Sequence, residues 1–105
     1  MPGRGAPGAA EVVIVGVITW ELHLGACQSL KEKRQIVKSL KDRLHRQFNV
    51  SVSETDHQDL WQRAELSAAV VTTDKRHAEQ VLQQADRLVA GADGARVMDS
   101  STSYL

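Results

Sequence analysis

The side chains with the greatest capacity for chemistry gather in one short stretch, VSETDHQDLWQRAELS, at residues 52–67. Asp56, His57 and Asp59 are of the types that ligate metals or exchange protons. Trp61 and Arg63 follow them, and both types are enriched at binding hot spots. The stretch is therefore a candidate for a metal site, a catalytic site, a contact surface or an ordered turn.

Metal binding and catalysis are the weaker interpretations of this stretch. Adjacent residues of an extended chain point to opposite faces, so Asp56 and His57 converge only if the chain turns sharply between them. A further ligand would have to come from His23 or Glu54. A His–Asp pair also needs a nucleophile, and no serine or cysteine is placed to serve as one. We therefore expect no metal, no cofactor and no catalytic residue.

An ordered turn is the simplest account of the stretch, and a contact surface is the second. Asp56 and Asp59 can accept hydrogen bonds from turn amides, as Asx motifs do. On this account Leu60 and Trp61 cover the end of the core, and Arg63 pairs with a neighbouring acid. If the hairpin end at residues 56–63 is a contact surface, the interaction candidates are Asp56, His57, Asp59, Trp61 and Arg63.

The cations are concentrated in a second segment, residues 29–48. It contains seven Lys and Arg against two acids, whereas the rest of the 105-residue chain contains six cations and eleven acids. At about 100° per residue, five basic side chains form a stripe roughly 20 Å long beside the apolar helix face. No acid lies inside this stripe, and Asp42 lies just beyond its edge. The members of this basic stripe are Lys31, Arg34, Lys38, Lys41 and His45.

Two interpretations of the basic stripe remain open. Like charges at this spacing weaken an isolated helix, which favours a surface that contacts RNA phosphates. The alternative is a solvated helix face that the acidic hairpin partly neutralises. Base stacking on the sheet, as in RNA-recognition motifs, is not expected. Residues 63–73 offer no aromatic side chain, and Trp20 falls among the buried positions.

The first element that must position these side chains is a strand at residues 12–24, which is rich in β-branched residues. Its second half alternates between apolar and polar side chains, so one face is buried and the other meets water. Its first half is apolar on both faces. That pattern suits a central strand or a contact with another subunit through Val13, Val15 and Val17.

Capping residues and the 3.6-residue repeat predict two helices. Ser29 and Glu32 form a capping box before the first helix, and Asn49 is placed to end it in the left-handed conformation. Asp74 caps the second helix, which GADG ends. Further strands are predicted at residues 50–56, 63–73 and 95–105. The expected α+β fold is ferredoxin-like, β-α-β-β-α-β, with a four-stranded antiparallel sheet and both helices on one face.

Composition predicts one small domain at residues 11–105, after a disordered leader at residues 1–10. Hydrophobic residues make up 42% and charged residues 25% of the chain, as in ordinary globular proteins. The single cysteine, Cys27, excludes an internal disulfide and fits a reducing cytosol. The longest apolar run, VVIVGVI, is far shorter than the roughly 20 residues that span a bilayer.

The motifs SLKEKR, RQFNVSV and DHQDLWQRA resemble the YlxP-like family, also called domain of unknown function 503. The resemblance runs from Val12 to Leu105. It implies a ferredoxin-like fold and a bacterial cytosolic protein whose gene tends to lie among genes for translation initiation and ribosome maturation. It implies no activity. Cys27 departs from the pattern, because a charged or small polar residue is expected there, so no family role is carried over to that position.

We therefore expect a cytoplasmic, non-enzymatic accessory protein that contacts RNA or a ribosomal particle through the basic face of residues 29–48. The alternative is a protein-interaction or dimerisation module, for example a homodimer, that uses the open sheet face and the 56–63 hairpin end. An acylphosphatase-like or metal-dependent enzyme is a weaker alternative. The turn LGACQS holds no arginine to clamp a phosphoryl group, and Asn49 lies at the far end of the helix. Neither a membrane nor a small-molecule substrate is expected.

Overall fold

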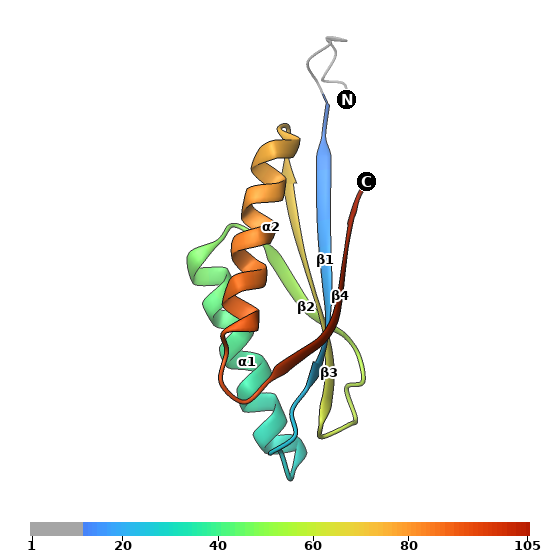
Figure 1. Cartoon of the computed structure of the whole chain (residues 1–105), viewed down its shortest axis with the longest axis vertical. Coiled ribbons are helices and arrows are strands. Elements are labelled where there is room, and N and C mark those ends of the chain that lie inside the picture. The colour runs from blue at the N-terminus through green and yellow to red at the C-terminus, as the bar shows by residue number, and fades with distance from the viewer. Residues whose placement is uncertain (1–11) are drawn as a thin grey trace, which may run out of the picture.

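The computed structural model describes residues 12–105, so the leader predicted at residues 1–10 lies outside the described residues. The elements follow the predicted order, and four strands form one antiparallel sheet with the order β2-β3-β1-β4. Both helices cover the same face of this sheet (Figure 1). The elements are β1 (Ile14–His23), α1 (Leu30–Gln47), β2 (Ser51–Asp56), β3 (Arg63–Thr72), α2 (Lys75–Ala90) and β4 (Arg96–Tyr104). The predicted ferredoxin-like fold is confirmed.

Side-chain caps fix where both helices begin. Ser29 Oγ accepts a hydrogen bond from the Glu32 N–H at 3.1 Å, and Glu32 Oε1 accepts one from the Gln28 N–H at 2.9 Å. At the start of α2, Asp74 Oδ1 accepts a hydrogen bond from the Arg76 N–H at 2.9 Å. Both predicted caps are therefore present, and they satisfy backbone donors that have no partner inside the helix.

The end of α1 differs from the prediction. The helix stops at Gln47, and Phe48 already has an extended backbone. The prediction that Asn49 ends the helix in the left-handed conformation is wrong, because the chain continues directly into β2. Among the described non-glycine residues, only His57 has a positive φ. Neither helix of residues 12–105 has the length and the apolar character needed to cross a membrane.

The core lies between the sheet and the two helices. Alternate side chains of β1 point toward the helices, and Ile18, Trp20 and Leu22 are at most 4% exposed. The predicted burial of Trp20 is confirmed, and its Nε1–H donates to Asp86 Oδ1 at 2.8 Å. The helices cover these residues with Val37, Leu40 and Leu44 of α1 and with Ala78, Leu82, Ala85 and Val89 of α2.

The helix layer does not cover the whole sheet. The second helix packs mainly on β1 and β3 and touches β4 much less. All residues of β4 except Val97 and Tyr104 are exposed. The fourth strand is therefore held mainly by its pairing with β1 and by Tyr104, whose ring packs over Gly16.

The buried thiol of Cys27 gives a first testable prediction. Cys27 is 2% exposed in the loop between β1 and α1, and burial raises the pKa of its thiol, with a further increase from the charge of Glu32. The thiol therefore stays protonated at neutral pH, and a thiol-reactive dye should label it only as fast as the protein unfolds. Labelling across a urea series should follow the unfolded fraction. Stoichiometric labelling in native buffer, at the rate of the denatured chain, would contradict the prediction.

Candidate functional site

The hairpin end between β2 and β3 is an ordered turn built around His57. Asp56 Oδ1 accepts a hydrogen bond from the His57 N–H at 2.7 Å, and the His57 carbonyl accepts one from the Leu60 N–H at 3.0 Å. His57 has φ 64°, a left-handed conformation that is uncommon for a residue other than glycine. The prediction that Asp56 bonds a turn amide is confirmed. Asp59 makes no hydrogen bond with the described residues, so the same prediction for Asp59 is wrong.

Glu21 joins two of the interaction candidates on the open face of the sheet. His57 Nε2 lies 3.0 Å from Glu21 Oε1 and 3.1 Å from Oε2. Arg63 Nη2 donates to Glu21 Oε2. The prediction that Arg63 pairs with a neighbouring acid is confirmed, and Glu21 of the central strand is that acid. This carboxylate therefore fixes both ends of the turn to β1.

A buried lysine that the apolar pattern did not reveal connects α1 to this turn. Lys33 is 1% exposed, its Nζ lies 2.7 Å from Glu54 Oε2, and it also donates to the His57 carbonyl. Glu54 Oε2 is itself buried and has no hydrogen-bond partner among the described residues, so the Lys33 ammonium is its ionic partner. A buried ammonium without oxygen partners is strongly unfavourable. Lys33 therefore holds α1, β2 and the turn in one arrangement.

The position of Lys33 carries a signal in the sequence. At about 100° per residue, it falls in the middle of the helix face that Val37, Leu40 and Leu44 form. A lysine at the centre of an apolar face must find an acid inside the fold or extend to solvent. Glu54 is the acid that Lys33 meets inside the fold, because the Glu54 side chain points to the helix side of β2, opposite Leu66.

Leu60 and Trp61 do not cover the core. They are 46% and 51% exposed, and they line an open hollow of about 610 Å³ together with Asp59, Gln62 and Arg63. The prediction that they close the end of the core is wrong. The loop between β1 and α1 instead contributes Leu24 and Cys27 to the core, at 0% and 2% exposure. Gln62 Nε2 donates to the carbonyls of Gly25 and Cys27 in this loop, both at 3.2 Å. An exposed tryptophan beside a hollow is a feature of contact surfaces.

The basic stripe lies on the outer side of α1. Lys31, Arg34, Lys38 and His45 are exposed, and Lys41 is half-buried. Lys38 Nζ lies 2.7 Å from Asp42 Oδ2, and this hydrogen bond lowers the pKa of the Asp42 carboxyl. An acid of the same helix therefore neutralises part of the stripe, and the hairpin does not. No ion pair within residues 12–105 joins the stripe to the hairpin acids.

The open sheet face carries an apolar patch at the end opposite the hairpin. Val15 of β1 pairs with Val71 of β3 on one side and with Leu105 on the other. Val71 is 67% exposed, Leu105 80% and Val13 63%. Val15 and Val17 are half-buried. The sequence predicts the β1 part of this patch. It does not predict Val71 and Leu105, because they join the patch only through the pairing of β1 with its neighbouring strands.

The candidate residues thus form three separate groups and no common catalytic centre. The hairpin end places His57 and Arg63 on Glu21 and leaves Asp59 and Trp61 outside that cluster. In the part of the chain that the structure describes, no three His, Cys, Asp or Glu side chains converge in a way that could hold a metal ion. Ion pairs of Glu21 and Lys33 hold the hairpin end in place, and the basic stripe and the apolar patch lie on other parts of the surface.

The role of Lys33 can be tested by stability. Lys33→Met removes the ammonium and leaves the Glu54 carboxylate buried without a counter-charge, so it should lower the free energy of unfolding by about 3–5 kcal/mol. The matched control Lys31→Met removes a charge from the exposed stripe and should change it by roughly 0.5 kcal/mol or less. Urea unfolding measures both values.

A second substitution separates charge burial from packing. Adding Glu54→Leu to Lys33→Met removes the orphaned carboxylate, so much of the lost stability should return. If Lys33→Met alone were as stable as the unmodified protein, the contact between Lys33 and Glu54 would not hold these elements together.

Comparison with known proteins places the chain in a family. The family model for "Protein of unknown function (DUF503)" matches residues 15–102. The chain is 37% identical to "Uncharacterized protein YlxP" of Bacillus subtilis (strain 168) over 71 residues, which cover 68% of this chain and 77% of that protein.

Among solved structures the chain is similar to the de novo designed protein Foldit4, with a TM-score of 0.51 and 16% identity over 87% of this chain and 96% of that one. It is also similar to the designed ferredoxin-fold protein LFR1 1, with a TM-score of 0.45 and 15% identity over 90% and 84%. The chain belongs to the DUF503 family.

Proposed function

We propose that this protein is a non-enzymatic accessory protein that binds RNA, free or in a ribosomal particle, through phosphate contacts along the basic stripe of α1. The observation that carries the proposal is the set of cations that no acid neutralises. Within the described residues, Lys31, Arg34 and Lys41 have no ion-pair partner. Cations held side by side on one rigid helix repel one another, and an anionic strand relieves that repulsion.

The position of the stripe leaves it open to a large partner. Arg43 and Gln47 of α1, with Phe48 directly after the helix, line a hollow with residues of α2, so this side of α1 faces the second helix. At about 100° per residue the stripe lies roughly on the opposite side of the helix, away from α2. From Lys31 to His45 it extends about 21 Å at 1.5 Å per residue, enough to contact several phosphates.

Recognition through phosphates and shape fits the rest of the molecule. Trp20 is fully buried and bonded to Asp86, so it offers no ring to a base. The middle of the open sheet face carries small hydroxyl side chains, and Thr19 and Ser67 hydrogen-bond to each other at 2.9 Å. Contacts to phosphates set position and orientation with little dependence on base sequence.

Charge reversal tests the proposal. The triple variant Lys31→Glu, Arg34→Glu and Lys41→Glu should weaken RNA binding for every sequence tried. Each lost phosphate contact should also flatten the slope of log K against log salt by about 0.7–0.9. The matched control, Arg76→Glu, Arg87→Glu and Arg96→Glu, makes the same change in net charge away from the stripe and should affect binding much less.

Two measurements read out this comparison: fluorescence anisotropy with labelled RNA over a salt series, and gradient sedimentation of lysate at low salt. Equal losses in both triple variants would mean that net charge, not the stripe, governs binding. Unchanged binding and an unchanged salt slope in the stripe variant would overturn the proposal.

Protein binding or dimerisation is the second candidate function, and the exposure of Leu60 and Trp61 favours it. Both side chains sit beside an open hollow on a turn that Glu21 and Lys33 hold in place. A rigid exposed aromatic side chain loses little conformational entropy when a partner covers it. The patch of Val13, Val71 and Leu105 offers a second apolar surface for the same purpose.

The two tryptophans provide a matched test of this candidate. Trp61→Ala should cost less than about 1.5 kcal/mol of stability, because half of the side chain is already in water. Trp20→Ala removes a fully buried ring and its hydrogen bond to Asp86 and should cost about 3–5 kcal/mol. Thermal and urea unfolding compare them. A loss of several kcal/mol in Trp61→Ala would assign Trp61 to the folded core and remove it from the contact surface.

A further inference from the structure

Among residues 12–105, the outer edge of β4 has no strand partner. The strand order β2-β3-β1-β4 leaves β4 bonded on one side only. Leu105 and Val15 exchange both backbone hydrogen bonds, at 2.8 and 3.4 Å. In an antiparallel pair, hydrogen-bonded and non-hydrogen-bonded positions alternate. It follows from the register that the N–H and C=O groups of Ser100, Thr102 and Tyr104 point outward, away from β1.

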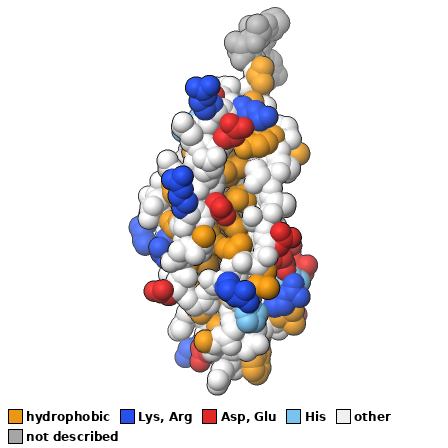
Figure 2. All heavy atoms as spheres, viewed as in Figure 1, with side chains coloured by type: hydrophobic (Ala, Val, Ile, Leu, Met, Phe, Trp, Pro, Cys, Tyr) orange, Lys and Arg blue, Asp and Glu red, His pale blue; other side chains and the backbone are white. Residues whose placement is uncertain are grey.

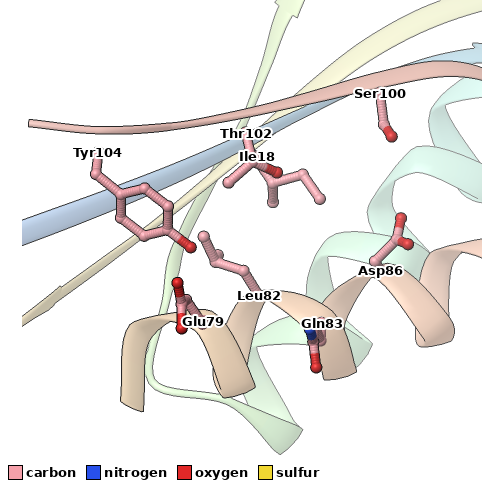
Figure 3. A pocket seen from close by; sticks show the side chains of 8 residues that line it. All are labelled: Ile18, Glu79, Leu82, Gln83, Asp86, Ser100, Thr102 and Tyr104. Carbon is pink, nitrogen blue, oxygen red and sulfur yellow. The ribbon is translucent and has the colours of Figure 1, made fainter. Parts of the chain in front are cut away.

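A groove runs beside this edge because the helix layer stops short of β4. The α2–β4 groove has a volume of about 360 Å³. Ile18 and Leu82 form its floor, and Ser100, Thr102 and Tyr104 line its β4 wall, as Figure 3 shows. Figure 2 shows hydrophobic atoms at the surface along this channel, with acidic side chains beside them. The side chains in the groove thus belong to the same β4 residues as the outward backbone groups.

The charged groups that line the groove are all acidic. Glu79 and Asp86 project from α2, and the remaining lining residues are neutral. The Trp20 Nε1–H holds the Asp86 carboxylate in place at 2.8 Å. Lys75 lies over the ring of Tyr104 at one end of the groove, 5.0 Å from the ring centre. The groove therefore attracts a cation to the stretch between Glu79 and Asp86.

The other edge of the sheet is less suited to pairing. The second strand has six residues, against nine in β4. A register shift between Glu54 and Asp56 interrupts its ladder. In β4 the corresponding irregularity lies near Met98, so residues 99–104 form an uninterrupted edge. No lysine or proline protects that edge, although natural edge strands commonly use both.

We propose that the β4 edge binds an extended, basic segment of a partner protein, which adds as a fifth strand and places its side chains in the α2–β4 groove. The outward groups of β4 supply the backbone hydrogen bonds, as in other strand-addition complexes. Glu79 and Asp86 lie seven residues apart, about 10 Å along the helix. Two lysines four positions apart on a strand project to the same face about 13 Å from each other. Their flexible stems can reach both carboxylates while the residue between them covers Ile18 and Leu82.

The blocked peptide TKTVTKT is the probe for this site, and fluorescence anisotropy measures its binding to the full chain. The acidic peptide TETVTET and the interrupted peptide TKTPTKT are the control ligands. We expect saturable binding of the first peptide and at least tenfold weaker binding of both controls. If the acidic peptide bound as tightly as the basic one, or if no peptide bound, the proposal would be overturned.

Variants of the protein separate the backbone contribution from the charge contribution. Thr102→Pro removes an outward N–H and leaves the pairing with β1 intact, so it should weaken binding at least tenfold without a loss of fold by circular dichroism. Glu79→Gln with Asp86→Asn should also weaken it at least tenfold. The control Glu65→Gln with Asp93→Asn makes the same change in net charge at sites outside the groove and should bind normally. An equal loss in this control would mean that only net charge matters, and the site would be rejected.

Amide exchange in the unmodified protein tests the site without any substitution. The amides of Ser100, Thr102 and Tyr104 should exchange rapidly in the free protein, and those of Ser101 and Ser103 should be protected. Addition of TKTVTKT should slow exchange at the first three by at least tenfold. Self-association at higher protein concentration could protect the same three amides without peptide. In that case the added strand would come from a second copy of this chain, and the proposal would be overturned.

Discussion

The buried ammonium of Lys33 is the contact on which the arrangement of the other candidate side chains depends. It must have oxygen partners, and it finds them on two different elements, in the Glu54 carboxylate of β2 and the carbonyl of His57. The left-handed backbone at His57 presents that carbonyl to Lys33 while the imidazole reaches Glu21 on the central strand. One electrostatic requirement therefore sets the register between α1, the edge of the sheet and the hairpin end.

The same construction separates two surfaces of opposite charge. The first helix packs over β2 and carries the basic stripe on its outer side. The second helix packs over β1 and β3 and carries Glu79 and Asp86 toward β4. The net charge of zero is thus an average over residues 29–48, with seven cations and two acids, and the rest of the chain, with six cations and eleven acids. Because ions screen exposed charges beyond roughly 8–10 Å, the field of the stripe and the field of the groove each act only locally at physiological salt.

The fold was predictable because its signals are local. Caps at Ser29 and Asp74 and the alternation in β1 each depend on neighbouring residues, and the structure contains them. The burial of Lys33 was missed, because a reading of apolar periodicity assigns every lysine to solvent. The pairing of Lys38 with Asp42 follows from their i, i+4 spacing, although Asp42 lies just outside the stripe of cations.

The surroundings of Trp61 could not be predicted from local pattern. The segment that follows Trp61 is tied to the loop before α1 by hydrogen bonds from Gln62 to the carbonyls of Gly25 and Cys27, more than thirty positions away in the chain. The local sequence specifies which residues make up a turn. It does not specify the distant backbone groups that the turn contacts in the folded protein. The exposure of Leu60 and Trp61 is therefore a property of the tertiary structure.

The strand order also has a kinetic consequence. Gly16 of β1 pairs with Tyr104, 88 positions further along the chain. Pairings this distant close slowly, because the entropy of a long loop must be lost before the contact forms. During synthesis, β1 can pair with β3 but must wait with its other edge open until β4 has been made. A chaperone that binds extended apolar segments would therefore encounter β1 in a half-paired state in every newly made molecule.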